Sequence, residues 1–189
     1  PVLTDSWQEA KEAVAFVRNS PIRTKASFTT PLIPISTAMM AWTASFTHFP
    51  AKMRWCTDNI WTNASIDDLL PGLRNVADTM PPAPSHALWL NWYPPEKRQD
   101  MAFSLEANRY FAVYGEWKQA ADDKNYANWA TDCMQKMEKH SVGIQLADEN
   151  LGRRPARFLA NANMQRLDNI RAEYDPDGRF HSWMGRLKT

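Results

Sequence analysis

Glycine is scarce in this sequence. Only 6 of the 189 residues are glycine, whereas an average soluble chain of this length contains roughly 13. Neither the G-x-G-x-x-G pattern of dinucleotide-binding folds nor the G-x-x-x-x-G-K-[ST] pattern of phosphate-binding loops occurs. Because such glycines let a backbone approach phosphate closely, we do not expect these residues to wrap a nucleotide by themselves.

Cysteine, long apolar runs and net charge are limited as well. Cys56 and Cys133 lie far apart without a C-x-x-C pattern, which fits a reducing compartment and predicts a cytoplasmic protein. No apolar run approaches the roughly 20 residues of a membrane span. The net charge is +1, and the arginines of residues 151–189 are interspersed with acids, as on a solvated face. We therefore expect neither a nucleic acid nor a membrane as partner, and the spacing of the four histidines predicts no metal site.

The residues that are present predict an α+β fold, with an antiparallel β-sheet, helices packed on one face and C-terminal helices. Periodicity and breakers indicate helices over residues 5–19, 69–80, 122–140, 152–162 and 163–174. Strands are expected over residues 52–57, 85–93, 101–106 and 109–117, the last two as a hairpin. Residues 1–50 combine the first helix with an extended segment rich in Pro, Ser and Thr. Residues 51–142 form an α+β domain, and residues 143–189 a C-terminal segment.

Aromatic and polar side chains alternate along two of the expected strands. Trp89, Asn91 and Tyr93 share one face of the first strand, and the opposite face carries His86, Leu88, Leu90 and Trp92. In the second strand, one face carries Tyr110, Ala112, Tyr114 and Glu116. A mixture of this kind is typical of a pocket wall, but aromatic residues also fill sheet cores. Both interpretations stay open for Tyr114, Glu116, Asn91 and Tyr93, whereas Trp92 and Trp117 are expected in the core.

The C-terminal third contains a recognisable signature. An Asn and an R-L pair lead a helix into an R-x-x-Y-D-P stretch and then a Phe, in the residues Asn163, Arg166-Leu167, Arg171, Tyr174-Asp175-Pro176 and Phe180. This order and spacing resembles the C-terminal signature of berberine-bridge-enzyme-like FAD-linked oxidases, of the vanillyl-alcohol-oxidase superfamily. Trp129 and Gly143 stand where that family has a helix Trp and a strand-start Gly, so the resemblance covers residues 129–180.

The resemblance implies a cofactor, FAD, bound mainly by a flavin-binding domain of the same or a partner polypeptide. Residues 51–142 would be the substrate-binding domain, and residues 143–189 would return to the flavin domain. Asn163 matches an Asn near the flavin, and residues 145–150 match a strand end that faces the isoalloxazine and often reads Y-x-N, with Leu146 in place of Tyr. The cofactor-binding candidates are therefore Asn163, Asn150 and Gln145.

The expected activity is oxidation of a small organic substrate by hydride transfer to the flavin, with O₂ as acceptor. The candidates for a base or orienting group are Tyr114, Glu116 and Tyr93, because they project from expected strands. The candidates for substrate contact are Trp89, Asn91 and Tyr110. Because the sequence begins with Pro1, we expect it to start inside a longer protein, and we expect the isolated chain to be inactive and to bind no FAD.

A different class of function is also consistent with the sequence. The aromatic-rich sheet could be the contact surface of a non-catalytic α+β module that binds a small molecule or a protein. A flavin-binding sequence upstream of Pro1 would favour the oxidase, and its absence would favour the module.

Overall fold

The computed structural model describes residues 2, 4–26, 29–47, 50–97 and 99–181. The chain divides into two compact units, Pro1–Ala44 and Ser45–Thr189. Each unit is described by itself.

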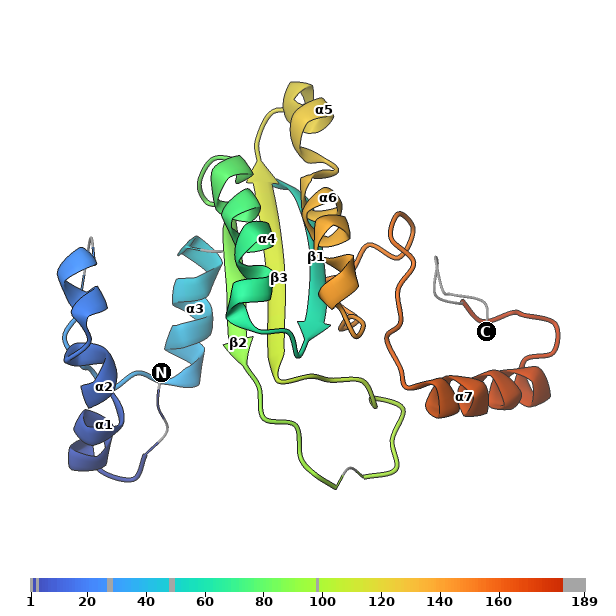
Figure 1. Ribbon diagram of the computed structural model, residues 1–189, viewed down its shortest axis with the longest axis horizontal. Helices are drawn as coiled ribbons and strands as arrows, with labels where there is room; N and C mark the ends of the chain where they lie inside the picture. Colours follow the sequence, from blue (N-terminus) through green and yellow to red (C-terminus); the bar gives the residue numbers. More distant parts are fainter. Residues whose placement is uncertain (1, 3, 27–28, 48–49, 98, 182–189) are drawn as a thin grey trace. The chain divides into compact units, whose positions relative to one another are not determined.

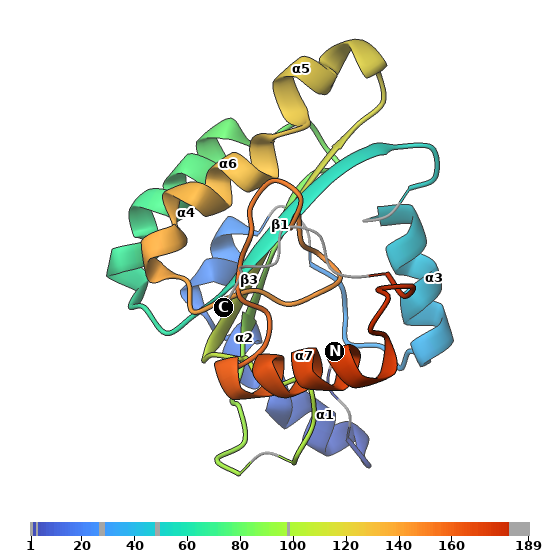
Figure 2. The ribbon, with the colours of Figure 1, turned by 90° about the vertical axis from the view of Figure 1, so that its right-hand side faces the viewer.

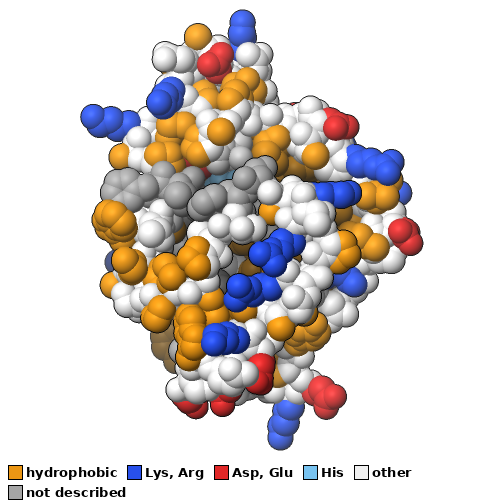
Figure 3. Space-filling view, turned by 90° about the vertical axis from the view of Figure 1, so that its left-hand side faces the viewer, with side chains coloured by type: hydrophobic (Ala, Val, Ile, Leu, Met, Phe, Trp, Pro, Cys, Tyr) orange, Lys and Arg blue, Asp and Glu red, His pale blue; other side chains and the backbone are white. Residues whose placement is uncertain are grey.

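The first unit begins with the predicted helix, in two pieces. Helix α1 (Trp7–Ala13) starts at Ser6, whose hydroxyl accepts a hydrogen bond from the Glu9 backbone amide at 3.2 Å, as in an N-cap. Helix α2 (Ala15–Arg18) follows, and then the 3₁₀ turn η1 (Pro21–Lys25) and helix α3 (Thr37–Thr47). Several large apolar side chains of this unit are exposed, among them Phe16 and Ile22. Figure 3 shows hydrophobic side chains lying beside Lys and Arg at the surface.

The second unit contains a three-stranded antiparallel sheet. Strand β3 (Arg109–Trp117) lies in the centre, between β1 (Arg54–Thr62) and β2 (His86–Asn91). Helices α4 (Ile66–Thr79) and α6 (Trp129–Lys136) cover one face of this sheet (Figures 1 and 2). The prediction of an α+β fold with helices on one face of an antiparallel sheet is confirmed.

The helix-covered face is an apolar core. Phe111, Val113 and Trp117 of β3 pack there with Val76 of α4 and with buried residues of α6. Gly115 lets Trp129 of α6 come close, because a Cβ at this position would lie 3.0 Å from the Trp129 Cε3 ring carbon. The prediction that Trp117 lies in the core is confirmed, since its side chain is buried.

The prediction of a hairpin over residues 101–117 is wrong for its first strand. Residues 101–106 form no strand, and Met101 and Phe103 are exposed. The physical reason lies in the sheet order: β3 already pairs with β1 on one side and β2 on the other, so no edge of β3 is open to a hairpin partner. Trp92 was also expected in the core, but it follows the last residue of β2 and is 40% exposed.

The helices after β3 are shorter than periodicity predicts. The expected helix over 122–140 is divided into η2 (Ala120–Asp122), α5 (Asp123–Tyr126), α6 and η3 (Glu138–His140). The break lets Tyr126 contact the Trp117 ring while Trp129 enters the core. No helix forms over 152–160, because this segment instead buries Ala156 and Phe158 in a small cluster against α7 (Asn161–Tyr174).

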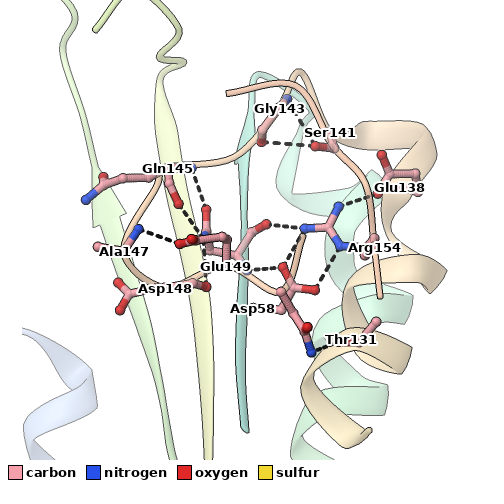
Figure 4. A network of polar contacts seen from close by, with 12 residues as sticks. Asp58, Thr131, Glu138, Ser141, Gly143, Gln145, Ala147, Asp148, Glu149 and Arg154 are labelled. Carbon is pink, nitrogen blue, oxygen red and sulfur yellow. Dashed lines mark hydrogen bonds and ion pairs between the residues drawn. The ribbon is translucent and has the colours of Figure 1, made fainter. Parts of the chain in front are cut away.

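The segment between η3 and α7 returns along the free edge of β1. Trp61 donates its backbone amide to the Gly143 carbonyl at 2.7 Å and accepts from the Val142 amide at 2.9 Å. Gly143 has a φ of +150°, and a Cβ there would lie 2.1 Å from a Leu105 side-chain carbon. Only glycine fits this crossing, which brings residues 144–150 to the sheet face that the helices leave uncovered (Figure 4).

Candidate functional site

The sheet face opposite α4 and α6 carries two tyrosines and a buried carboxyl group. Strand β3 contributes Tyr110, Tyr114 and Glu116 to this face, because alternate residues of a strand point the same way. The register places His86 of β2 and Thr57 of β1 on either side of Tyr114. We call this surface the tyrosine face.

Two tyrosines share one carboxylate. The hydroxyls of Tyr110 and Tyr114 donate to the same oxygen of Asp148, Oδ2, at 3.0 and 2.8 Å. Burial raises the pKa of both phenols, and the neighbouring Asp148 raises it further. Both phenols therefore stay neutral donors around neutral pH, suited to orient a ligand rather than to remove a proton.

Glu116 is a buried carboxyl group without hydrogen bonds. The residue is 1% exposed, and neither carboxyl oxygen has a hydrogen-bond partner among the described residues. Burial raises its pKa to about 7. A carboxyl group poised near neutral pH is a suitable general base, and buried polar groups without hydrogen bonds are uncommon enough to require an explanation.

His86 is the ionisable side chain that contacts Glu116. Its Nδ1 lies 3.4 Å from Glu116 Oε1, and its ring stacks on Tyr114 with centroids 4.7 Å apart. Tyr114, Glu116 and His86 thus form one contiguous group, which continues through Tyr114 to Asp148.

The segment that supplies Asp148 is fixed by the side chain of a buried Asn, Asn59. Asn59 of β1 is fully buried. Its Nδ2 donates to the carbonyls of Gln145 and Asp148 at 2.9 and 2.8 Å, and its Oδ1 accepts from the Gln145 amide at 2.8 Å. Every hydrogen bond of this side chain therefore serves to place the Asp148 loop on the tyrosine face.

A buried arginine holds the same segment further along. Arg154 is 5% exposed and donates to both carboxylate oxygens of Asp58, at 2.9 and 2.6 Å. It also donates to Glu138 Oε2 and to the Asn59 carbonyl, each at 2.6 Å. Figure 4 shows the guanidinium between these acceptors. Such charge-assisted, two-pronged bonds are strong and directional.

The nine candidate residues do not all meet in space. Tyr110, Tyr114 and Glu116 lie together on the tyrosine face, whereas the register pairs Trp89 with Phe111 and Asn91 with Arg109, on the helix-covered side. Trp89 and Asn91 bond to each other at 3.0 Å. The two sets of side chains that the sequence suggested for a pocket wall therefore lie on opposite faces of the sheet and cannot line the same pocket.

The other candidates are more dispersed. Tyr93 lies two residues beyond β2 and is 89% exposed. Asn163 of α7 donates to the Met101 carbonyl at 2.8 Å, and Asn150 donates to Thr131 of α6 at 3.1 Å. Gln145 reaches the tyrosine face through its backbone, which bonds to Asn59.

Sequence reasoning missed two residues of this site, His86 and Asp148. The strand pattern had placed His86 on the face with Leu88 and Leu90, without a partner. Its contact with Glu116 follows only from the register between β2 and β3. Asp148 lies in the stretch from Gly143 to Asn150 that carries part of the resemblance, and this was the available signal for it.

The described residues contain no group of three or more His, Cys, Asp or Glu side chains that could hold a metal ion. In the same part of the chain, every helix is too short or too polar to cross a membrane.

Comparison with known proteins gives one consistent result. No protein-family model and no solved structure matches the chain. Three curated relatives are FAD-linked oxidoreductase ptmO of Penicillium ochrochloron, penO of Penicillium crustosum and janO of Penicillium janthinellum, each 26% identical over 133 to 138 residues. The chain is similar to FAD-linked oxidoreductases. The alignments cover 69% of this chain but only 29 to 30% of each relative. They support an oxidoreductase-related role and the use of FAD in this family.

Proposed function

We propose that this chain is the substrate-binding and C-terminal part of a berberine-bridge-enzyme-like FAD-linked oxidoreductase that acts on a small organic molecule. The names of the relatives support FAD, and the signature from Asn163 to Phe180 supports the narrower family. The observation that carries the proposal is the Glu116 carboxyl, which is buried on the sheet face opposite α4 and α6 and has no hydrogen-bond partner in the part of the chain that the structure describes.

In this proposal a flat, partly apolar group such as a flavin ring lies over the tyrosine face. The aromatic rings and Glu116 are buried there, and so is the hydroxyl of Thr57, which has no hydrogen-bond partner among the described residues. Gln145, Asn150 and Asn163 are the proposed contacts to the cofactor. When bound, FAD supplies the hydride acceptor and, in our proposal, passes the electrons to O₂. The FAD phosphates would be held mainly by a flavin-binding domain of the same or a partner polypeptide.

The residues of this chain would then bind the substrate and accept its proton. Glu116 acts as the base, because its raised pKa leaves part of the population ionised near neutral pH. Tyr114 and Tyr110 remain neutral and orient the substrate through phenol oxygens that Asp148 holds in place. Substrate entry requires a neighbour of the buried Glu116 to move. Trp55, its cross-strand partner, is 38% exposed and is the proposed lid.

The domain assignment forms part of the proposal. Residues 51–142 would shape the substrate site, and residues 143–189 would return to the flavin domain. Trp89 and Asn91 lie on the opposite face of the sheet from the tyrosine face. In this proposal, Trp89, Asn91 and Tyr93 would therefore contact the substrate or the flavin domain at a different surface from the tyrosine face.

The deciding experiment is purification of the native protein that carries this chain, followed by its visible absorption spectrum. We expect the absorption bands of an oxidised flavin, and we expect the codons before Pro1 to encode a glycine-rich stretch of the R-G-G-G-H type. The isolated chain mixed with FAD is the matched control, and it should stay colourless after gel filtration. A colourless native protein would overturn the proposal and favour a non-catalytic binding module.

A further inference from the structure

His86 and Glu116 approach each other across the strand pair β2–β3. His86 is the register partner of Tyr114, and its ring stacks on that tyrosine at an interplanar angle of 15°. The stacking directs Nδ1 toward Glu116 Oε1, at 3.4 Å. The imidazole is the more accessible partner, with its side chain 21% exposed, while the Glu116 side chain is 0% exposed.

The backbone around His86 indicates which ring nitrogen carries a hydrogen. Nδ1 lies 3.1 Å from the Pro84 carbonyl oxygen. A carbonyl oxygen can only accept, so this bond requires an Nδ1–H group. This Nδ1–H is bonded to the Pro84 carbonyl, whereas Glu116 Oε1, 3.4 Å from the same nitrogen, makes no hydrogen bond with it. The contact between imidazole and carboxyl is therefore electrostatic, and it favours the ionised carboxylate most when the imidazole is protonated.

Ser85 fixes the spacing between the two residues. Its hydroxyl accepts from the Glu116 backbone amide at 2.9 Å and donates to the Glu116 carbonyl at 3.3 Å. Because Ser85 is the residue before His86, the start of β2 is anchored directly to the backbone of Glu116. The bonds between the Ser85 hydroxyl and the Glu116 main chain therefore help to set the short distance between imidazole and carboxyl.

The other groups around Glu116 offer no comparable cation. Strand β1 places Trp55 opposite Glu116 and Thr57 opposite Tyr114, both uncharged. Strand β3 contributes Tyr114, which is neutral, and the 141–154 segment contributes Asp148, which bonds to Tyr114. Among the described residues, no lysine or arginine forms an ion pair with Glu116, whose one recorded ionic contact is with His86.

We infer that His86 is a positioning residue, whose imidazole beside Glu116 Oε1 favours the ionised, proton-accepting form of the Glu116 carboxyl against the opposing effect of burial. The use of this carboxylate as a base depends on the proposed function. The contact between the two side chains does not, and it can be measured without flavin or substrate.

The test is a pH titration of the Glu116 side-chain carboxyl by ¹³C NMR in the full 189-residue chain, with E116Q used to assign the signal. His86→Leu removes the imidazole, and we expect it to raise the titration midpoint of Glu116 by about one pH unit. His86→Asn keeps a polar group near the position of Nδ1 but cannot carry a charge, and its midpoint should fall between those of the parent and His86→Leu. This order reports on the electrostatic effect of the imidazole, which a merely structural role of His86 would not produce.

His140→Asn is the matched control, because His140 lies in η3, away from the tyrosine face. It should leave the midpoint unchanged. Amide spectra establish that each variant is folded, and if His86→Leu does not fold, the comparison of the parent with His86→Asn decides. An unchanged Glu116 midpoint in the folded His86 variants overturns the inference. A native protein that lacks flavin overturns the proposed function instead, so the two failures are distinguishable.

Discussion

The two faces of the sheet are closed by different forces. One face is covered by α4 and α6 through apolar contacts around Phe111, Val113 and Met134. The other has a smaller apolar cluster around Trp61 and Tyr110, and it is partly covered by residues 144–150, which polar bonds from Asn59 and Arg154 hold in place. An apolar core tolerates many changes of side chain, whereas a buried polar network destabilises the fold unless each polar group has a hydrogen-bond partner. The polar groups of the tyrosine face are therefore better explained by a function than by stability.

The largest expected effect comes from breaking the polar closure at Arg154. Arg154→Met would leave the Asp58 carboxylate buried, at 1% exposure, without its cation. We expect a loss of about 3–5 kcal/mol in the free energy of unfolding, measured by urea denaturation. Met134→Ala in the apolar closure gives the comparison, with an expected loss of about 2–5 kcal/mol.

The matched control is Arg166→Met, which makes the same change in an ion pair with Asp100 whose side chains are 64% and 74% exposed. This exposed pair should contribute far less to stability than the buried Arg154 pair, because solvent screens exposed charges. Amide exchange of residues 145–148 should accelerate in Arg154→Met and not in Met134→Ala. Equal costs for the two arginine variants would contradict a polar closure of the tyrosine face.

The second prediction concerns the pH dependence of the polar face. Burial raises the pKa of Glu116 from 4.5 to about 7, so the folded protein holds this proton more tightly than the unfolded chain. The stabilisation is complete below about pH 4.5 and is lost as the pH rises to about 7. Relative to E116Q, the parent should lose about 3 kcal/mol across this range.

Urea denaturation of both chains at a series of pH values measures this difference. Glu106→Gln is a control, because Glu106 accepts from Trp92 Nε1 near the surface and its slope should follow that of the parent. Parallel stability curves for the parent and E116Q would mean that the Glu116 carboxyl is solvated in solution.

Local patterns in the sequence predicted helices and strands better than they predicted which residues meet in space. The strand over 85–93 and the helix around Leu69 and Val76 are confirmed, because alternation, helical spacing and prolines are local signals. The side of the sheet on which Trp89 lies relative to Tyr110 depends on strand register, and a shift of one residue reverses it.

The candidate site follows the same rule. Glu116 and Tyr114 could be selected from the alternation of one strand. Asp148 could not be paired with Tyr110, since 38 residues separate them and the pairing depends on Asn59 and Gly143 turning the chain. The incorrect prediction of a strand over 101–106 also depends on contacts between distant residues. Only the complete sheet order shows that β3 has no free edge.

The smallest effect tests whether the tyrosine face acts as a unit. Tyr114→Phe removes one donor from Asp148 but leaves the Tyr110 bond, so we expect a loss of only about 1 kcal/mol in the free energy of unfolding. The double variant Tyr110→Phe/Tyr114→Phe leaves the carboxylate without either phenol. Its cost should exceed the sum of the single variants by at least about 0.5 kcal/mol. Costs that simply add would mean that the two phenols reach Asp148 independently, and that the tyrosine face has no more internal coupling than a patch of ordinary surface.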